Sequence, residues 1–203
     1  PLTLNWEQEH VPAILNVWFG GSEAADAIAD VVFGDVCPSG KLTTTFPQNV
    51  GQLPMAYNHK NTGRPLKEGK WFEKFRSNYL DVPNTPLYPF GYGLSYTRYV
   101  YSHASYRDGA LSVTVQNAGS VAGEEIVQAY LKDLDSPLAV RNHSLCAIQR
   151  VPLAPGESRR VTLPIAPDAF SCVLEDGSRA VTGRRFTPVS YTHLRAHETR
   201  HDL

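Results

Sequence analysis

A series of short β-like segments at nearly regular spacing is the feature that most restricts the fold of this chain. From Tyr99 to Gly177 these segments follow one another roughly every ten residues and are separated by turn-forming residues. In one of them Leu111, Val113 and Val115 alternate with polar residues, which is the pattern of a strand with one buried face. We therefore expect an immunoglobulin-like β-sandwich over residues 97–187.

The first part of the chain has a different pattern. Residues 12–21, PAILNVWFGG, form an apolar run that ends in two glycines, as expected of a buried parallel strand. Ser22 can cap the segment that follows, in which apolar residues recur at helical spacing as far as Gly34. This order predicts a strand and then a helix, one half of a βα unit. A long polar loop follows from Gln52 to Pro89.

The two regions are joined by the stretch TPLYPFGYGLSYT at residues 85–97. Its prolines exclude a helix or a central strand. On an extended chain Tyr88, Phe90 and Tyr92 would point to one side. We interpret the stretch as an ordered connector whose rings either pack at a domain seam or form a platform for a ligand. The domain boundary then falls near residue 96.

Charge and cysteine content exclude several classes of protein. The formal net charge of the 203-residue chain is −1, which gives no reason to expect a nucleic-acid partner or an anionic membrane. No apolar run is long enough to span a bilayer. The three cysteines are widely spaced, which argues against a disulfide framework or a zinc site. Because the chain starts without methionine, we interpret it as a fragment, and the lack of a signal peptide does not identify a compartment.

A search for catalytic motifs assigns no catalytic residue. GDVCPSGK at residues 34–41 is not a phosphate-binding loop, because five residues separate its glycines where four are needed and Leu42 stands where Ser or Thr is required. Glu124 and Glu125 are neighbours on an expected strand, so their side chains point to opposite faces and cannot act on one bond.

A cluster of polar side chains in YNHKNTGRP, residues 57–65, is the candidate binding site. Asn58, His59, Lys60 and Arg64 offer hydrogen-bond donors close to the aromatic connector. Sugars are bound by such donors together with aromatic faces. The same composition also fits a solvated polar loop, and both interpretations remain open at this point.

Three stretches, GDVCPSGKL, YNHKNTGRP and YPFGYGLSYT, make the chain resemble the C-terminal part of glycoside hydrolase family 3, especially bacterial β-glucosidases of the periplasmic type. The resemblance runs from about Leu2 to Phe186. It implies the C-terminal part of an α/β sandwich over residues 1–96, followed by a fibronectin type III-like β-sandwich over residues 97–187. In this family the nucleophilic aspartate lies on a barrel, and the acid/base glutamate would lie upstream of Pro1.

The resemblance implies a retaining, exo-acting β-glycosidase that needs no metal or organic cofactor and acts on a β-linked oligosaccharide or glycoside. It also implies a periplasmic or secreted enzyme of which this fragment alone is inactive. The alternative is a non-catalytic carbohydrate-binding or adhesion β-sandwich module. The preferred sugar, the linkage and the oligomeric state are not determined by the sequence.

The end of the chain departs from the pattern. Residues 188–203 show neither strand alternation nor a stable helical face, and VSYTHLRAHET resembles the translation of a sequencing adapter. We therefore expect a non-biological tail and a sandwich that lacks most of its closing strand. Under this interpretation the helical spacing of His193, His197 and His201 is an accident and not a metal site.

Overall fold

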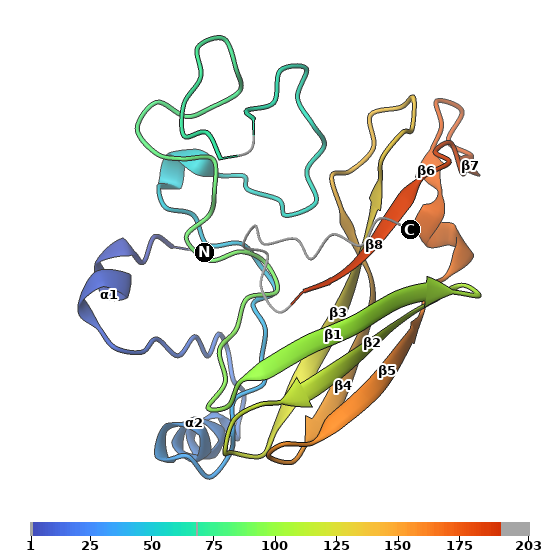
Figure 1. Ribbon diagram of the computed structural model, residues 1–203. Helices are drawn as coiled ribbons and strands as arrows, with labels where there is room; N and C mark the ends of the chain where they lie inside the picture. Colours follow the sequence, from blue (N-terminus) through green and yellow to red (C-terminus); the bar gives the residue numbers. More distant parts are fainter. Residues whose placement is uncertain (1, 68, 192–203) are drawn as a thin grey trace.

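The computed structural model describes residues 2–67 and 69–191, with a loop-rich first half and a β-rich second half (Figure 1). The first half holds α1 (Asn5–His10), α2 (Ala24–Phe33) and the short 3-10 helix η1 (Val50–Gln52). None of the helices in the described part of the chain is long and apolar enough to cross a membrane.

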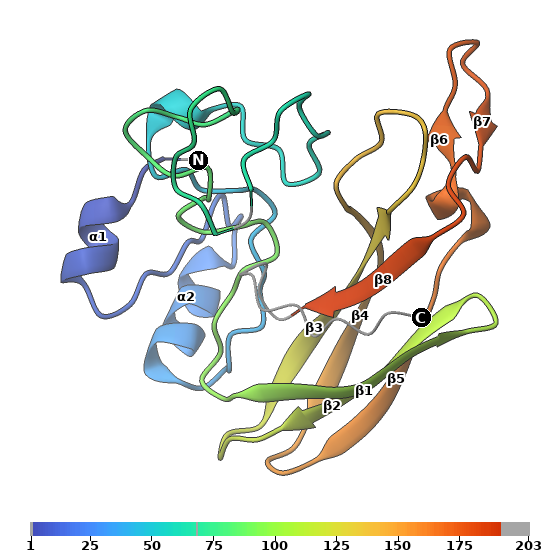
Figure 2. The ribbon, with the colours of Figure 1, turned by 45° about the horizontal axis from the view of Figure 1, so that its top comes forward.

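The second half is a sandwich of two antiparallel sheets, which confirms the β-sandwich predicted from the alternation (Figure 2). One sheet has the order β1 (Tyr99–Arg107), β2 (Ala110–Asn117) and β5 (Ser158–Pro164). The other has the order β4 (Ser144–Leu153), β3 (Gly123–Asp133) and β8 (Phe186–Tyr191). The helix η2 (Pro167–Phe170) leads into a small hairpin of β6 (Cys172–Val173) and β7 (Arg179–Ala180).

The core lies between the two sheets and consists of every second residue of the facing strands. Leu111, Val113 and Val115 of β2 are almost fully buried against Val127 and Ala129 of β3, with further apolar residues of β4 and β5 around them. Burying each of the larger side chains contributes about 1.5–3 kcal/mol. The period-2 pattern therefore predicted the buried face of β2, which packs in this core.

The predicted strand at residues 12–21 is wrong, because this segment is a loop in the structure. Ile14 and Trp18 are 41% and 51% exposed, and Phe19 is fully exposed. A parallel strand exists only when a neighbouring strand satisfies its backbone groups, and no described strand lies beside this segment. The helix that follows is confirmed as α2, and Gly34 ends it with a left-handed φ of 88°. The expected cap at Ser22 is wrong, because the N-cap residue is Glu23 and no side chain caps the helix.

The connector turns where Tyr92 N–H donates to Pro89 O, 3.1 Å away, and its backbone pairs with the segment 42–46. Leu42 N–H donates to Tyr92 O, and Gly91 N–H donates to Leu42 O, both at 2.7 Å. Because of this turn the expected one-sided ring face is wrong. Tyr88 and Tyr92 stack with centroids 5.2 Å apart, whereas Phe90 meets the edge of Tyr130 of β3 at 6.5 Å.

The expected loss of most of the closing strand is also corrected. Strand β8 continues as far as Tyr191 and pairs with β3, from Asp133 opposite Phe186 to Gln128 opposite Tyr191. A ladder is made by backbone N–H and C=O groups, so a segment without side-chain alternation can still complete it. Residues 192–203, including the three tail histidines, lie outside the described residues.

Candidate functional site

The loop that carries the predicted binding residues is docked onto the connection between β3 and β4. Arg141 Nη1 donates to Asn58 O at 3.2 Å, and Asn142 N–H donates to His59 O at 3.0 Å. Lys60 forms an isolated antiparallel bridge with Arg141. Backbone contacts therefore place three of the four predicted residues beside the β-sandwich.

The side chains of this loop remain available to a ligand to different degrees. His59 and Lys60 are exposed and Asn58 is half-buried, and Asn142 Nδ2 lies 3.2 Å from His59 Nδ1. Arg64 does not join this contact. Its side chain is exposed, and its carbonyl accepts a hydrogen bond from Ser77 N–H at 2.9 Å. The structure thus brings Asn58, His59 and Lys60 together and holds Arg64 in a separate part of the loop.

An aromatic cluster fixes the base of the loop. The ring of Tyr57 stacks on Phe90 with centroids 4.0 Å apart and meets the edge of Tyr130 at 6.1 Å. Its hydroxyl accepts a hydrogen bond from Leu145 N–H at 3.3 Å. His143 lies against the same rings, and burial, with the positive charges of His59 and Lys132, lowers its pKa. The loop therefore starts from a rigid point at the seam.

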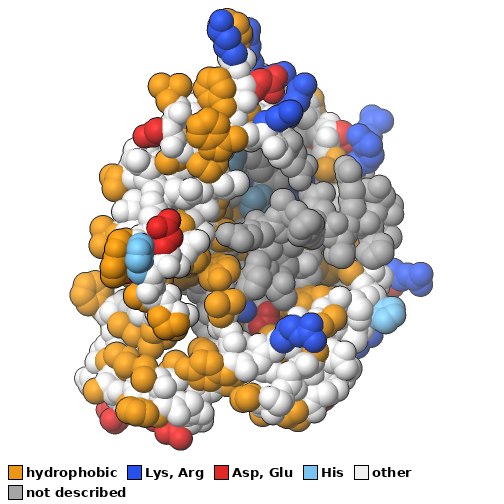
Figure 3. Space-filling model, turned by 60° about the vertical axis from the view of Figure 1, so that its left-hand side comes forward, with side chains coloured by type: hydrophobic (Ala, Val, Ile, Leu, Met, Phe, Trp, Pro, Cys, Tyr) orange, Lys and Arg blue, Asp and Glu red, His pale blue; other side chains and the backbone are white. Residues whose placement is uncertain are grey.

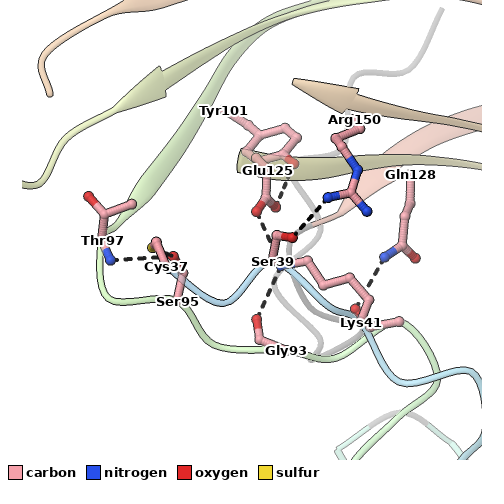
Figure 4. Close-up of polar contacts among 11 residues, drawn as sticks. Cys37, Ser39, Lys41, Gly93, Ser95, Thr97, Tyr101, Glu125, Gln128 and Arg150 are labelled. Carbon is pink, nitrogen blue, oxygen red and sulfur yellow. Dashed lines mark hydrogen bonds and ion pairs between the residues drawn. The ribbon is translucent and has the colours of Figure 1, made fainter. Parts of the chain in front are cut away.

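Sequence reasoning missed the buried polar network at this seam, which Figure 4 shows. Lys41 Nζ donates to Gly93 O and to Glu125 Oε2, both at 3.1 Å. Tyr101 OH donates to Glu125 Oε1 at 2.9 Å. The Glu125 side chain is 1% exposed and that of Lys41 is 9% exposed. Burial is the main cause that raises the pKa of Tyr101 well above its usual range, and the negative charge of Glu125 is the second. The Tyr101 hydroxyl therefore stays protonated and donates its hydrogen bond.

One signal in the sequence could have revealed this network. Glu125, Val127 and Ala129 share one face of β3, so a carboxylate stands where the alternation requires a core residue. A buried carboxylate needs a partner of opposite charge. The prediction that the two neighbouring glutamates point to opposite faces is confirmed, since Glu124 pairs with Arg150 at the surface, with Nη1 and Oε2 2.5 Å apart.

Close backbone approach at the connector requires glycine. A Cβ on Gly93 would lie 2.3 Å from Gly40 O. A Cβ on Gly91, whose φ is +79°, would lie 2.5 Å from Gln128 Oε1 of β3. Real Cβ contacts are not this short, so Gly93 is needed for the connector to lie against the Gly40 backbone and Gly91 for it to approach β3.

The chemistry that this site offers is binding and positioning. Glu125 and Glu124 are each paired with a cation, and Asp135 accepts hydrogen bonds from the backbone N–H groups of Arg184 and Arg185. Among the described residues no group of three or more His, Cys, Asp or Glu side chains is arranged to hold a metal ion. The loop 57–65 supplies hydrogen-bond donors beside the seam.

Two family profiles match the chain. Residues 1–96 match the C-terminal domain of glycosyl hydrolase family 3, and residues 125–187 match a fibronectin type III-like domain. The first match contains the loop and all but the last residue of the connector, and the second contains most of β3 and all of β4 and β5. The fold class and the family resemblance inferred from the sequence are therefore confirmed.

Curated relatives and solved structures agree with these profiles. The chain is 44% identical over 178 residues to a periplasmic β-glucosidase of Salmonella typhimurium, covering 84% of this chain and 23% of the relative. It is 36% identical over 195 residues to a β-xylosidase of Formosa agariphila, covering 92% and 26%. The structure of a β-glucosidase from Listeria innocua in complex with gluconolactone superposes with a TM-score of 0.87 at 33% identity, covering 95% and 28%. The chain thus spans about a quarter of the length of the relatives it matches.

Proposed function

Because the chain belongs to glycoside hydrolase family 3, we propose that it supplies the C-terminal part of a retaining, exo-acting β-glycosidase. The proposed substrates are β-linked oligosaccharides or glycosides. The observation that carries this proposal is the succession of the family's C-terminal domain and a fibronectin type III-like domain in one chain, at 44% identity to a β-glucosidase.

The proposed reaction is a double displacement. One carboxylate attacks the anomeric carbon, and a carboxylic acid protonates the leaving oxygen and then activates water as a base. We propose that both groups belong to parts of the enzyme other than this chain. The role of this chain is to present Asn58, His59, Lys60 and Arg64 at the rim of the active site, where they donate hydrogen bonds to sugar hydroxyls.

The exposed apolar residues of the first half support a place in a larger α/β domain. Hydrophobic side chains gather over the face that carries α1 and α2 (Figure 3). Phe19 is fully exposed, and Trp6 and Phe33 are 63% and 82% exposed. Large apolar side chains that are exposed together on one face mark an interface. In the proposed enzyme other parts of the protein cover these side chains.

We also propose that the enzyme works in the periplasm or outside the cell. The support is the similarity to the Salmonella protein, which is named a periplasmic β-glucosidase.

A chimera tests the proposal. The matching last part of the Salmonella β-glucosidase is replaced by residues 2–191 of this chain, and turnover of aryl β-glucosides and β-xylosides is measured. We expect a folded, active chimera, and no activity from the isolated chain or from the truncated relative. A well-folded but inactive chimera would contradict the proposal and favour a non-catalytic module. Turnover by the isolated chain above a heat-inactivated control would contradict the assignment of the carboxylates to other parts of the enzyme.

A further inference from the structure

A cleft of about 290 Å³ lies on the β-sandwich beside the candidate loop. Its walls come from the end of β3, the connection at residues 138–141 and the segment from η2 to β7. Lys60 of the candidate loop also lines the cleft, so two distant parts of the chain form it. Its volume is close to the lower limit of small-molecule sites and corresponds to a ligand no larger than one sugar ring.

The cleft is positively charged. Lys60, Arg141 and Arg179 line it, and none of the three forms an ion pair with another residue in the described part of the chain. Arg179 is held in place, because its Nε donates to Ser171 Oγ at 3.0 Å. The carboxylate of Asp133 also lines the cleft, but one of its oxygens already accepts hydrogen bonds from two backbone N–H groups. Three cations against one carboxylate favour an anionic ligand.

The inner wall of the cleft is apolar. Leu131 is 6% exposed, and the rings of Phe170 and Phe186 meet edge to face with centroids 5.0 Å apart. An apolar wall suits the C–H face of a sugar ring, whereas a phosphate or sulfate ion gains nothing from it. The three cations therefore favour a charged group of the ligand, and the apolar wall favours its ring.

We propose that this cleft binds a carboxylate-bearing monosaccharide, such as a hexuronic acid unit of an acidic glycan. The carboxylate lies among Lys60, Arg141 and Arg179, where charge-assisted hydrogen bonds hold it, and the ring packs on the apolar wall. The cleft is a binding site and takes no part in bond cleavage. It goes beyond the proposed glycosidase function, because it requires no catalytic residue and shares only Lys60 with the residues proposed for the active-site rim.

The test is a titration of the full ¹⁵N-labelled chain with D-glucuronate at low salt, followed through its amide resonances. We expect saturable shifts at residues of the cleft, weaker binding at higher ionic strength and no such response to D-glucose. Lys60→Met removes an exposed charge and is expected to weaken binding roughly fivefold. The matched control is Lys67→Met, an exposed lysine of the same long loop outside the cleft, which leaves the affinity unchanged.

Three results would overturn the proposal. One is the absence of saturable shifts at the cleft in the folded chain. The second is an equal response to D-glucose, which would show that charge is not recognised. The third is equal affinity for sodium sulfate, which would reduce the site to attraction of any anion. Because the readout is binding, each result leaves the activity of the chimera, and hence the glycosidase proposal, unaffected.

Discussion

Lys41 and Glu125, 84 residues apart in the sequence, meet with Nζ 3.1 Å from Oε2 at the seam between the two halves of the chain. The second oxygen of Glu125 accepts the Tyr101 hydroxyl, and Lys41 also donates to Gly93 O of the connector. A buried charge pair contributes little over an apolar pair of the same shape, but removal of one partner leaves a costly unpaired charge. This pair therefore links the first half of the chain to β3 through a buried contact in which each charged group depends on the other.

Lys41→Met is expected to lower the free energy of unfolding by about 3–5 kcal/mol, because Glu125 stays buried without its cation. Urea denaturation measures the effect, with the exposed Lys70→Met as the control. The double variant Lys41→Met/Glu125→Leu is expected to recover most of the loss. A single variant within about 0.5 kcal/mol of the natural chain would show that the ion pair does not hold the seam.

Gly93→Ala is expected to destabilise the chain by about 1–3 kcal/mol, because its Cβ would lie 2.3 Å from Gly40 O and force the connector away from the segment 42–46. Gly63→Ala is the matched control, since a Cβ there meets nothing within 4 Å and its φ is not in the left-handed region. Thermal unfolding of the two variants measures the difference. Equal midpoints would contradict the close approach at Gly93.

The stability of the chain is expected to fall when the pH is lowered below about 6.5, the usual pKa of histidine, because His143 is partly buried. Its pKa is lowered in the folded state, first by burial and then by the positive charges of His59 and Lys132. The unfolded chain therefore takes up a proton at a higher pH than the folded chain. The loss of stability continues until the pH reaches the pKa of His143 in the folded chain. Above about pH 6.5 the stability contributed by neutral His143 is fully present.

His143→Phe is expected to remove this dependence while it keeps a ring against Tyr57 and Tyr130. Urea denaturation at pH 7.5, 6 and 5 gives the free energy of unfolding of both chains. The same slope with pH in both would assign the effect to other groups.

In the active chimera, Lys60→Ala and Arg64→Ala are each expected to raise KM by roughly 3–10 fold with a smaller change in kcat, since each removes a hydrogen-bond donor to substrate. Lys67→Ala serves as the control in the same loop. Unchanged kinetic constants in both variants would reject the proposed role of the loop at the active-site rim.

The sequence by itself determined the elements whose stability depends on local patterns. Alternation at Leu111, Val113 and Val115 predicted a buried strand face, because successive side chains of a strand point to opposite faces and those on the buried face are apolar. Gly34 predicted the end of α2, because a left-handed residue there is a local requirement. The four candidate residues of the loop were likewise named from local composition, although their proposed role stays a prediction.

Contacts between distant segments were decided only by the tertiary structure. Residues 12–21 look like a strand, but strand formation needs a partner, which local sequence does not report. Lys41 and Glu125 lack any regular spacing that would mark them as a pair. The turn at Pro89–Tyr92 places Phe90 against Tyr130 and away from Tyr88. The docking of Asn58, His59 and Lys60 onto the β3–β4 connection has the same origin. The type of a residue indicates whether its side chain is buried. Which distant residue it contacts depends on how the rest of the chain folds.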